Sequence, residues 1–309
     1  MKVGITLPNL GPQATRENVL QTAIQAENEG FDSVWAISRI LYPLKPQSPF
    51  RGTPDGLLPI EYQNALDPLD VLVYVAANTS KISLGTSIID MFFYTPILLA
   101  KRYATLDVLS QGRVIAGLGL GWSKEEYQAS NIPFVNRGER ADEFLQVMKK
   151  IWTDDIVEFK GKYYNIPASK VEPKPIQKPD IPIYLGGFSS KTFSRIVNQD
   201  LNGWLGGMQG LAQLENTENA IKQYADQMNK DSNNFRTILV TYPNVQNQSP
   251  TNDSDRLILT GTIDEIGRDI QQIKDMGVDH IVFGYNFVPI GRDVDKMISV
   301  SKELSKYAR

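Results

Sequence analysis

Short apolar runs alternate with amphipathic stretches along most of the chain. Residues 3–7, 82–88 and 114–118 are rich in apolar side chains without strict alternation, which is typical of parallel strands covered on both faces. Between such runs, apolar residues recur at helical spacing, as in residues 136–152. The pattern therefore predicts repeated strand–helix units.

Eight strands are predicted, and each is followed by a helix. The strands cover residues 3–7, 31–37, 82–88, 114–118, 183–185, 203–205, 237–242 and 280–284. The helices cover residues 15–30, 67–78, 96–109, 136–152, 221–228, 262–276 and 293–307, with a short one after residue 190. Right-handed units of this number close into a (β/α)8 TIM barrel, with an open doubly wound sheet as the alternative. No composition break divides the chain, so we expect a single domain over residues 1–309.

Two local signals refine this prediction. Residues 15–18 (Thr-Arg-Glu-Asn) resemble a capping box at the start of the first helix. Residues 157–164 read as a small hairpin that turns at Lys160-Gly161.

The stretch of residues 41–66, after the second strand, breaks the strand–helix rhythm. It holds five prolines and shows no periodicity. Irregular insertions of this length are usually functional, so we expect a lid over a pocket; a linker between domains is the alternative.

A glycine-rich strand end lies near the middle of the chain. Gly117, Gly119 and Gly121 remove side chains at alternate positions, so that backbone or a flat ligand can approach one face. Trp122 follows directly. The alternative is a strand end that packs beneath this tryptophan.

Composition excludes several classes of function. A net charge of −3 gives no drive toward nucleic acid or an anionic membrane. The absence of cysteine excludes disulfides, thiolate nucleophiles and cysteine-ligated metals. No apolar run approaches the ~18 residues of a membrane helix, and the amino-terminal run is too short for a signal peptide, so we expect a cytoplasmic protein.

The chain has one histidine, His280, at the start of a predicted strand. Ligand-facing residues of parallel α/β folds lie instead at the carboxyl ends of strands. We therefore expect a structural role for His280 and no metal site.

Several blocks resemble a known family. They are AENEGFDSVW (residues 26–35), LGTSI (84–88), LAKRYATLDVLSQGR (99–113), GLGLGW (117–122) and PIYLGG (182–187). The chain is similar in these blocks to the luciferase-like monooxygenase superfamily, and most of all to its branch dependent on the deazaflavin coenzyme F420. The resemblance runs from residue 1 to about residue 205, and more loosely to residue 285.

The resemblance implies a TIM barrel, a homodimer, and a flavin or deazaflavin ring at the carboxyl face. Ser87-Ile88 matches a position where the family often has a non-prolyl cis peptide behind the ring; an ordinary strand end is the alternative. Leu120, Gly121 and Trp122 match the loop beside the reactive side of the ring. Some deazaflavin enzymes carry an acid at the position of Trp122, but an indole cannot donate a proton at neutral pH.

The resemblance also implies a phosphate-binding loop. It consists of four consecutive residues, Gly186, Gly187, Phe188 and Ser189. Consecutive amides that lead into a helix favour an anion, although a plain strand-to-helix turn is the alternative.

One departure from the family lies at the end of the second strand. Where the family often has Asp-His, this chain has Ser38-Arg39. Ser38 is the expected cofactor contact, and Arg39 is suited to stabilising anionic charge but is a poor general acid. Glu126 is the catalytic candidate after the glycine loop, with Glu125 as a further candidate. Tyr42, Tyr62 and Tyr127 complete the candidate proton relays, and for each of these five residues packing or solvation is the alternative.

The leading hypothesis is a coenzyme F420-dependent oxidoreductase that moves a hydride to or from a small organic substrate. The alternatives are an FMN-dependent monooxygenase served by a flavin reductase, a non-catalytic flavin-binding protein, and a sugar-phosphate barrel enzyme. Arg39 and Arg51 together would suit a substrate carboxylate. Residues 91–94 (Met-Phe-Phe-Tyr) form either an apolar pocket wall or part of the core or a dimer contact.

Overall fold

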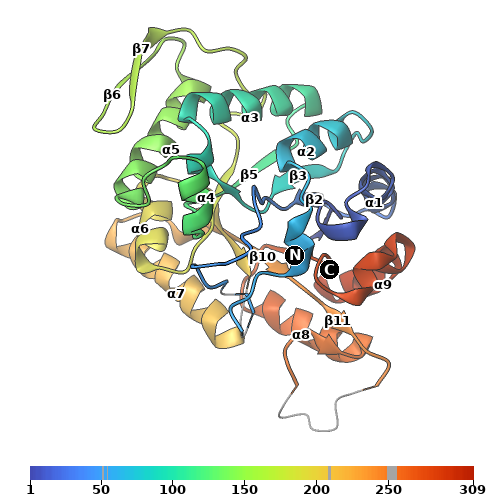
Figure 1. Cartoon of the computed structure of the whole chain (residues 1–309). Coiled ribbons are helices and arrows are strands. Elements are labelled where there is room, and N and C mark those ends of the chain that lie inside the picture. Colours follow the sequence, from blue (N-terminus) through green and yellow to red (C-terminus); the bar gives the residue numbers. More distant parts are fainter. Residues whose placement is uncertain (51, 54, 208–209, 249–255) are drawn as a thin grey trace.

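The computed structural model describes residues 1–50, 52–53, 55–207, 210–248 and 256–309. Within them, parallel strands form a closed barrel in the order β3-β2-β1-β13-β10-β9-β8-β5, and β5 pairs with β3 (Figure 1). The barrel strands are β1 (Lys2–Thr6), β2 (Ser33–Ala36), β3 (Ser83–Thr86), β5 (Val114–Gly119), β8 (Ile183–Leu185), β9 (Gly203–Gly207), β10 (Arg236–Thr241) and β13 (His280–Phe283). The short β4 (Ile89–Asp90) continues β3 along β5. The predicted barrel is confirmed.

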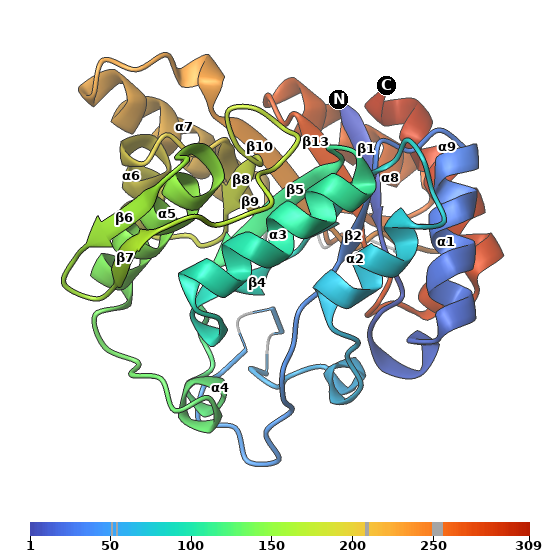
Figure 2. The same cartoon turned by 90° about the horizontal axis from the view of Figure 1, so that it is seen from above.

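A ring of helices surrounds the strands (Figure 1). The ring consists of α1 (Arg16–Asn28), α2 (Pro68–Ala76), α3 (Pro96–Ser110), α5 (Arg137–Thr153), α6 (Ser190–Asn198), α7 (Leu211–Gln227), α8 (Ile263–Asp275) and α9 (Val294–Ala308). The short helix α4 (Lys124–Ala129) lies at one end of the barrel (Figure 2). Two further pairs are β6 (Val157–Lys160) with β7 (Asn165–Ser169), and β11 (Asn244–Val245) with β12 (Thr260–Gly261). Among the described helices, none is both long and apolar enough to span a membrane.

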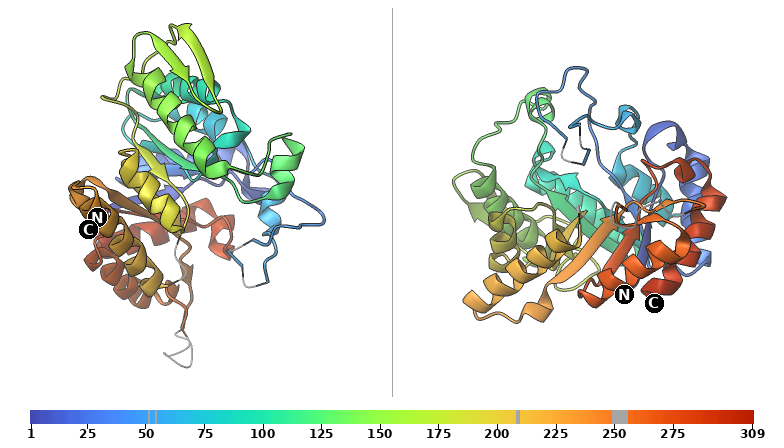
Figure 3. Two further views of the ribbon diagram at one scale, coloured as in Figure 1. Left: turned by 90° about the vertical axis from the view of Figure 1, so that its left-hand side faces the viewer. Right: turned by 90° about the horizontal axis from the view of Figure 1, so that it is seen from below.

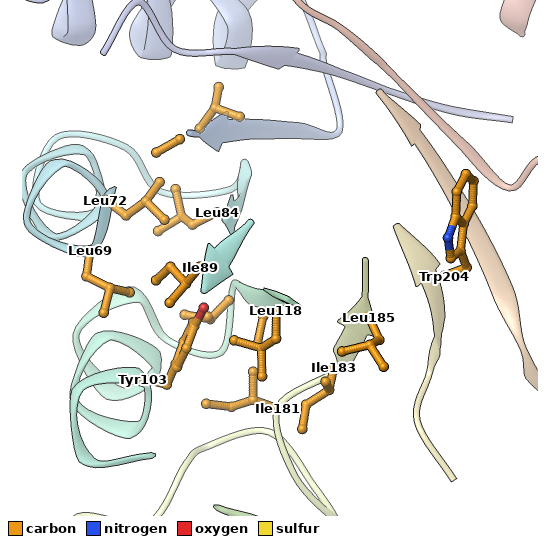
Figure 4. Close-up of a cluster of buried hydrophobic side chains, with 14 of the residues drawn as sticks. Leu69, Leu72, Leu84, Ile89, Tyr103, Leu118, Ile181, Ile183, Leu185 and Trp204 are labelled. Carbon is orange, nitrogen blue, oxygen red and sulfur yellow. The ribbon is translucent and has the colours of Figure 1, made fainter. Parts of the chain in front are cut away.

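The main core lies between the strands and the helices. Figure 4 shows apolar side chains of β3, β4 and β5 facing Leu69 and Leu72 of α2 and Tyr103 of α3. Both leucines and Tyr103 are almost wholly buried. Each such side chain contributes roughly 1.5–3 kcal/mol through burial, so this layer stabilises the barrel from outside.

A second, smaller core fills the barrel interior around Trp35. This indole is fully buried, and its Nε1 donates to Ser33 Oγ at 2.6 Å. Gly4 and Gly85 leave room for it, because a Cβ at either position would collide with the Trp35 side chain. The Trp35 side chain therefore requires glycine on both strands that flank β2, at Gly4 of β1 and at Gly85 of β3.

The long insertion predicted after the second strand is confirmed. Figures 2 and 3 show the chain between β2 and α2, together with α4, at the end of the barrel opposite to both termini. The insertion includes the 3-10 helix η2 (Ile60–Gln63). Arg51 lies outside the described residues.

The predicted hairpin turn is wrong. The second strand of the hairpin is β7, and residues 161–164 form the turn. The side chain of Glu143 explains the shift: its carboxylate accepts the amide N–H groups of Lys162, Tyr163 and Tyr164 at 2.8–3.1 Å. These amides are then not free to extend a ladder with β6.

Two helix starts also differ from the prediction. Thr15 caps α1 by accepting the Asn18 amide at 3.2 Å, but the Asn18 side chain donates to Gln13 instead of completing a capping box. Helix α7 begins ten residues before the predicted Ile221. Its first turns are polar, and Thr217 takes one of the buried positions where the periodicity calls for an apolar residue.

Candidate active site

The floor of the candidate site is a bulge between β3 and β4. The ladder with β5 passes from the Gly85–Ile115 pair to the Ile89–Leu118 pair, so three residues on one strand face two on the other. The Ser87–Ile88 peptide within the bulge is cis, as the resemblance implied.

The Ile88 side chain lies across the carboxyl mouth of the barrel. Its Cδ1 is 2.6 Å from the position that a Cβ of Gly119 would occupy and 2.5 Å from that of Gly186. Both glycines are therefore required for this placement. Ile88 also packs on the interior core around Trp35, so it forms an apolar floor above that core.

Buried hydrogen bonds hold the bulge. Thr86 Oγ1 accepts the Gly117 amide and donates to the Gly117 carbonyl, each at 3.0 Å. The Tyr103 hydroxyl lies 2.7 Å from Thr86 Oγ1. A Cβ at Gly117 would collide with the Thr86 carbonyl, so the alternate glycines of β5 do allow close backbone approach.

The predicted phosphate loop borders this floor. Gly186 follows β8, and Trp204 Nε1 donates to the Gly187 carbonyl at 2.7 Å. Ser189 caps the nine-residue helix α6 by accepting the Thr192 amide at 3.2 Å. Phe188 is 46 % exposed and packs edge-on against Trp204. The loop thus leads into a helix amino terminus, where backbone amides favour an anion.

An ion pair connects the insertion to α4. Arg39 Nε lies 3.3 Å from Glu126 Oε1, and both side chains are at most 4 % exposed. The same Glu126 oxygen accepts the Ile40 amide at 3.0 Å, while Arg39 Nε donates to the Leu41 carbonyl at 2.8 Å. Burial raises the pKa of Glu126, and the Arg39 charge opposes that rise.

Aromatic rings surround the Arg39 guanidinium. Its Cζ lies 5.0 Å from the centre of the Trp122 ring and 5.9 Å from that of Tyr62. Phe50 contacts both of these rings, and Tyr62 continues to Phe287. Arg39 Nη2 is buried and has no hydrogen-bond partner within the described part of the chain. A buried donor without a partner is costly, which marks this position as one suited to a ligand acceptor.

Asp90, which the sequence did not single out, lies beside the floor. Its Oδ1 is 3.0 Å from the Cβ position of Gly119, and its Oδ2 is 3.2 Å from that of Gly121. Desolvation, together with the charge of Glu126, raises the pKa of Asp90 to about 7. The residue nevertheless keeps part of its surface accessible. The sequence did offer a signal for Asp90: it is a single acidic residue two positions after Ile88 in an otherwise apolar run.

The predicted site residues mostly meet at this mouth. Trp122 and Glu126 both contact Arg39. Ile88 adjoins Gly119, and Asp90 adjoins both Gly119 and Gly121. Leu120 and Gly121 are held through their carbonyls, which accept from the Tyr127 hydroxyl and from Arg137 Nη1. Ser38 follows β2 and is partly buried.

Other candidates have packing roles in the structure. Glu125 accepts the amides of Gln47 and Ser48 and so holds the insertion, while the Tyr42 hydroxyl donates to the Leu58 carbonyl. Met91 and Phe92 are buried in the outer core. The alternative of a pocket wall is therefore wrong for these two residues.

His280 lies at the opposite end of the barrel. Its Nε2 is 2.8 Å from Ser33 Oγ. Burial and the nearby Lys2 ammonium lower the pKa of His280 to about 3. Within the described residues, no group of three or more metal-ligating side chains is assembled.

Comparison with known sequences places this geometry in context. The family model described as luciferase-like monooxygenase matches residues 1–253. The uncharacterized protein Rv0953c of Mycobacterium tuberculosis is 33% identical over 181 residues, which is 58% of this chain and 64% of that protein. An F420-dependent glucose-6-phosphate dehydrogenase of Amycolatopsis mediterranei is 31% identical over 193 residues, which is 60% of this chain and 51% of that enzyme. The chain thus spans less than two thirds of the length of these relatives.

Solved structures share the fold. The monooxygenase RslO1 of Streptomyces bottropensis superposes with a TM-score of 0.80 at 18% identity, over 99% of this chain and 98% of its own. An F420-dependent secondary alcohol dehydrogenase gives a TM-score of 0.77 at 20% identity, over 100% of this chain and 99% of its own. A type II Baeyer–Villiger monooxygenase of Pseudomonas putida, in complex with FMN, gives 0.76 at 14% identity, over 100% and 97%.

Proposed function

The chain belongs to the luciferase-like monooxygenase family, a family of oxidoreductases, and from this premise we propose that it binds coenzyme F420 and transfers a hydride to or from a small organic substrate. The choice of F420 rests on relatives named as F420-dependent dehydrogenases, of 31% and 35% identity. FMN is the alternative cofactor, with a flavin reductase as partner in that case.

The observation that carries the proposal is the floor at the barrel mouth. Gly119 and Gly186 have no side chains, and the Ile88 Cδ1 atom occupies the space where their Cβ atoms would point. A planar ring fits such a surface, and the amides of residues 187–189 adjoin it for a phosphate tail, since the Gly186 amide donates to the Leu118 carbonyl at 2.8 Å. The residues present therefore fit a flavin or deazaflavin.

When bound, the cofactor supplies the hydride chemistry, and the protein positions and shields it. The Ile88 side chain would support the ring, and Gly121 and Trp122 would lie at its edge. The insertion is held over the mouth by the Arg39–Glu126 ion pair, and its closure would exclude water from the reaction.

Binding of each purified cofactor tests the proposal. Quenching of F420 and FMN fluorescence would be titrated with the protein, using oxidised and reduced forms. We expect tighter binding of F420 than of FMN. Tighter binding of reduced FMN, with oxygen consumption, would favour the monooxygenase. Binding of either cofactor without turnover of any acceptor would favour a non-catalytic flavin-binding protein.

We further propose a homodimer through α2 and α3. Apolar side chains are exposed on the outer faces of these helices, namely Val73, Ile97, Leu98, Val108 and Leu109. Light scattering on the protein should give twice the mass of the chain. Replacing Leu98 and Leu109 by Glu should give a monomer, whereas Leu257→Glu, at an exposed leucine elsewhere, should not.

A further inference from the structure

Two polar groups of unlike chemistry lie beside the floor at the barrel mouth. One is the carboxyl of Asp90 at the end of β4, and the other is Arg39 Nη2, which lacks a hydrogen-bond partner in the described structure. The Gly121–Trp122 segment connects them: the Gly121 amide bonds the Asp90 carboxylate, and the Trp122 ring packs under the Arg39 guanidinium. Asp90 thus borders Gly121, Arg39 borders the adjacent Trp122, and the Arg39 charge acts on the Asp90 carboxyl.

The protein uses part of each group: Arg39 Nε holds Glu126 and the Leu41 carbonyl, and the Asp90 carboxylate accepts the Gly121 amide. Arg39 Nη2, in contrast, is buried without a hydrogen-bond partner in the described structure and can bind a ligand acceptor. Asp90 keeps accessible surface although protein atoms surround its carboxylate. A group that is desolvated and yet reachable is suited to proton transfer near neutral pH.

Building on the proposed hydride transfer, we propose that Asp90 exchanges the accompanying proton, and that Arg39 Nη2 and the Asp90 carboxyl together bind the oxygen of an alcohol–carbonyl substrate pair. Gly119 adjoins both Ile88 and Asp90, so the acid borders the surface on which the ring would lie. This assigns the proton-donor role to a residue outside the Ser38-Arg39 and Trp122 positions.

The proton and electron balance is simple. In oxidation, the alcohol loses its C–H hydrogen as a hydride to the oxidised deazaflavin, and its O–H proton passes to the Asp90 carboxylate as the carbonyl forms. In reduction, the carbonyl carbon gains a hydride from the reduced deazaflavin, and its oxygen gains the proton from the Asp90 carboxylic acid. Arg39 Nη2 donates a hydrogen bond to that oxygen in both directions.

Desolvation by burial is the largest cause of the raised pKa of Asp90, and several charged or titratable groups around it adjust that pKa. The Glu126 carboxylate raises the pKa of Asp90, and the Arg39 and Arg137 guanidinium groups lower it. Two tyrosines also interact electrostatically with it, Tyr62 of the insertion and Tyr127 of α4. Glu126→Gln should therefore lower the pKa of Asp90, and Arg39→Met should raise it.

The first test needs no cofactor. Carbon NMR of protein labelled at the aspartate side-chain carboxyl would be followed through a pH titration. We expect one resonance that titrates near pH 7, is absent in Asp90→Asn, and moves in opposite directions in the Glu126 and Arg39 variants. Asp180→Asn is the control, since burial also raises the pKa of Asp180, which precedes β8 and so lies at the end of the barrel opposite to the mouth. A titration near pH 7 that persists in Asp90→Asn overturns the proposal.

The second test uses the loaded enzyme. Single-turnover oxidation of reduced F420 by acetone and cyclohexanone would be followed across the neutral pH range. Asp90→Asn should slow it by about 100-fold or more with F420 affinity retained, since general acid catalysis typically contributes at least that much. Arg39→Met should mainly raise the ketone concentration that gives half the maximal single-turnover rate, and Asp180→Asn should behave as wild type.

The outcomes separate this proposal from the proposed function. A wild-type protein that binds no F420 contradicts the proposed function, while the NMR titration still decides the state of Asp90. Binding of F420 without oxidation by either ketone, or equal rates in wild type and Asp90→Asn, overturns the proposal for Asp90 and leaves F420 binding intact.

Discussion

Arg39 and Glu126 form a buried ion pair, with 3.3 Å between Nε and Oε1, that joins the end of β2 to α4. The two residues are far apart in the sequence, and each also holds the backbone of the insertion. The pair therefore connects the lid to the wall of the mouth.

Removing one partner of this pair should be costly. Arg39→Met or Glu126→Gln leaves the other group buried and uncompensated, and we expect each to lower the free energy of unfolding by about 3 kcal/mol. The double variant should lose less free energy of unfolding than the two single variants lose together. Urea unfolding of the four proteins measures the coupling, and strictly additive losses would show that the pair is not a unit.

A side chain at Gly186 should disturb the floor. Gly186→Ala places a Cβ 2.5 Å from Ile88 Cδ1, so the isoleucine must move. We expect a loss of about 1–3 kcal/mol in stability and weaker cofactor binding. Gly207→Ala is the matched control at the end of β9, because its nearest atom is 3.6 Å away. Fluorescence titration and thermal unfolding would be compared; equal effects of the two substitutions contradict the role of Ile88.

Trp35 and Gly85 should show energetic coupling. A Cβ at Gly85 would collide with the indole, so Gly85→Ala should destabilise the barrel by roughly 1–3 kcal/mol. Trp35→Leu alone should cost several kcal/mol through the cavity that it leaves. In Trp35→Leu the alanine substitution should be nearly neutral. Urea unfolding of the four proteins measures this, and an undiminished cost in the leucine background would refute direct contact as the cause.

His280 should make stability depend on pH. Its pKa is about 3 in the folded protein, against an ordinary value of 6.5, so only the unfolded chain binds the proton between these limits. The contribution of neutral His280 to the free energy of unfolding is therefore complete above about pH 6.5 and is lost as the pH falls toward 3. At about pH 5 the free energy of unfolding is lower by roughly 2 kcal/mol. Urea unfolding at about pH 7 and pH 5 would be compared with His280→Gln. That variant should be less pH-dependent, and an unchanged pH dependence would exclude His280 as the source.

The sequence by itself determined the order of the barrel elements and much of the site. Buried strands, helix caps and glycines at strand ends leave local signals, because backbone conformation and local periodicity depend on neighbouring residues. Gly119 was found in this way, whereas Gly186, the Ser87-Ile88 position and Arg39 were singled out through the family resemblance.

Only the tertiary structure decided which side chains meet. The Asp90 carboxyl gains its high pKa from desolvation and from Glu126, which belongs to a different element. Glu143 moves the hairpin turn by binding amides about twenty residues away, and Thr217 takes a buried place in α7 that periodicity assigns to an apolar residue. Desolvation and long-range hydrogen bonds depend on distances in space, which a pattern along the chain does not contain.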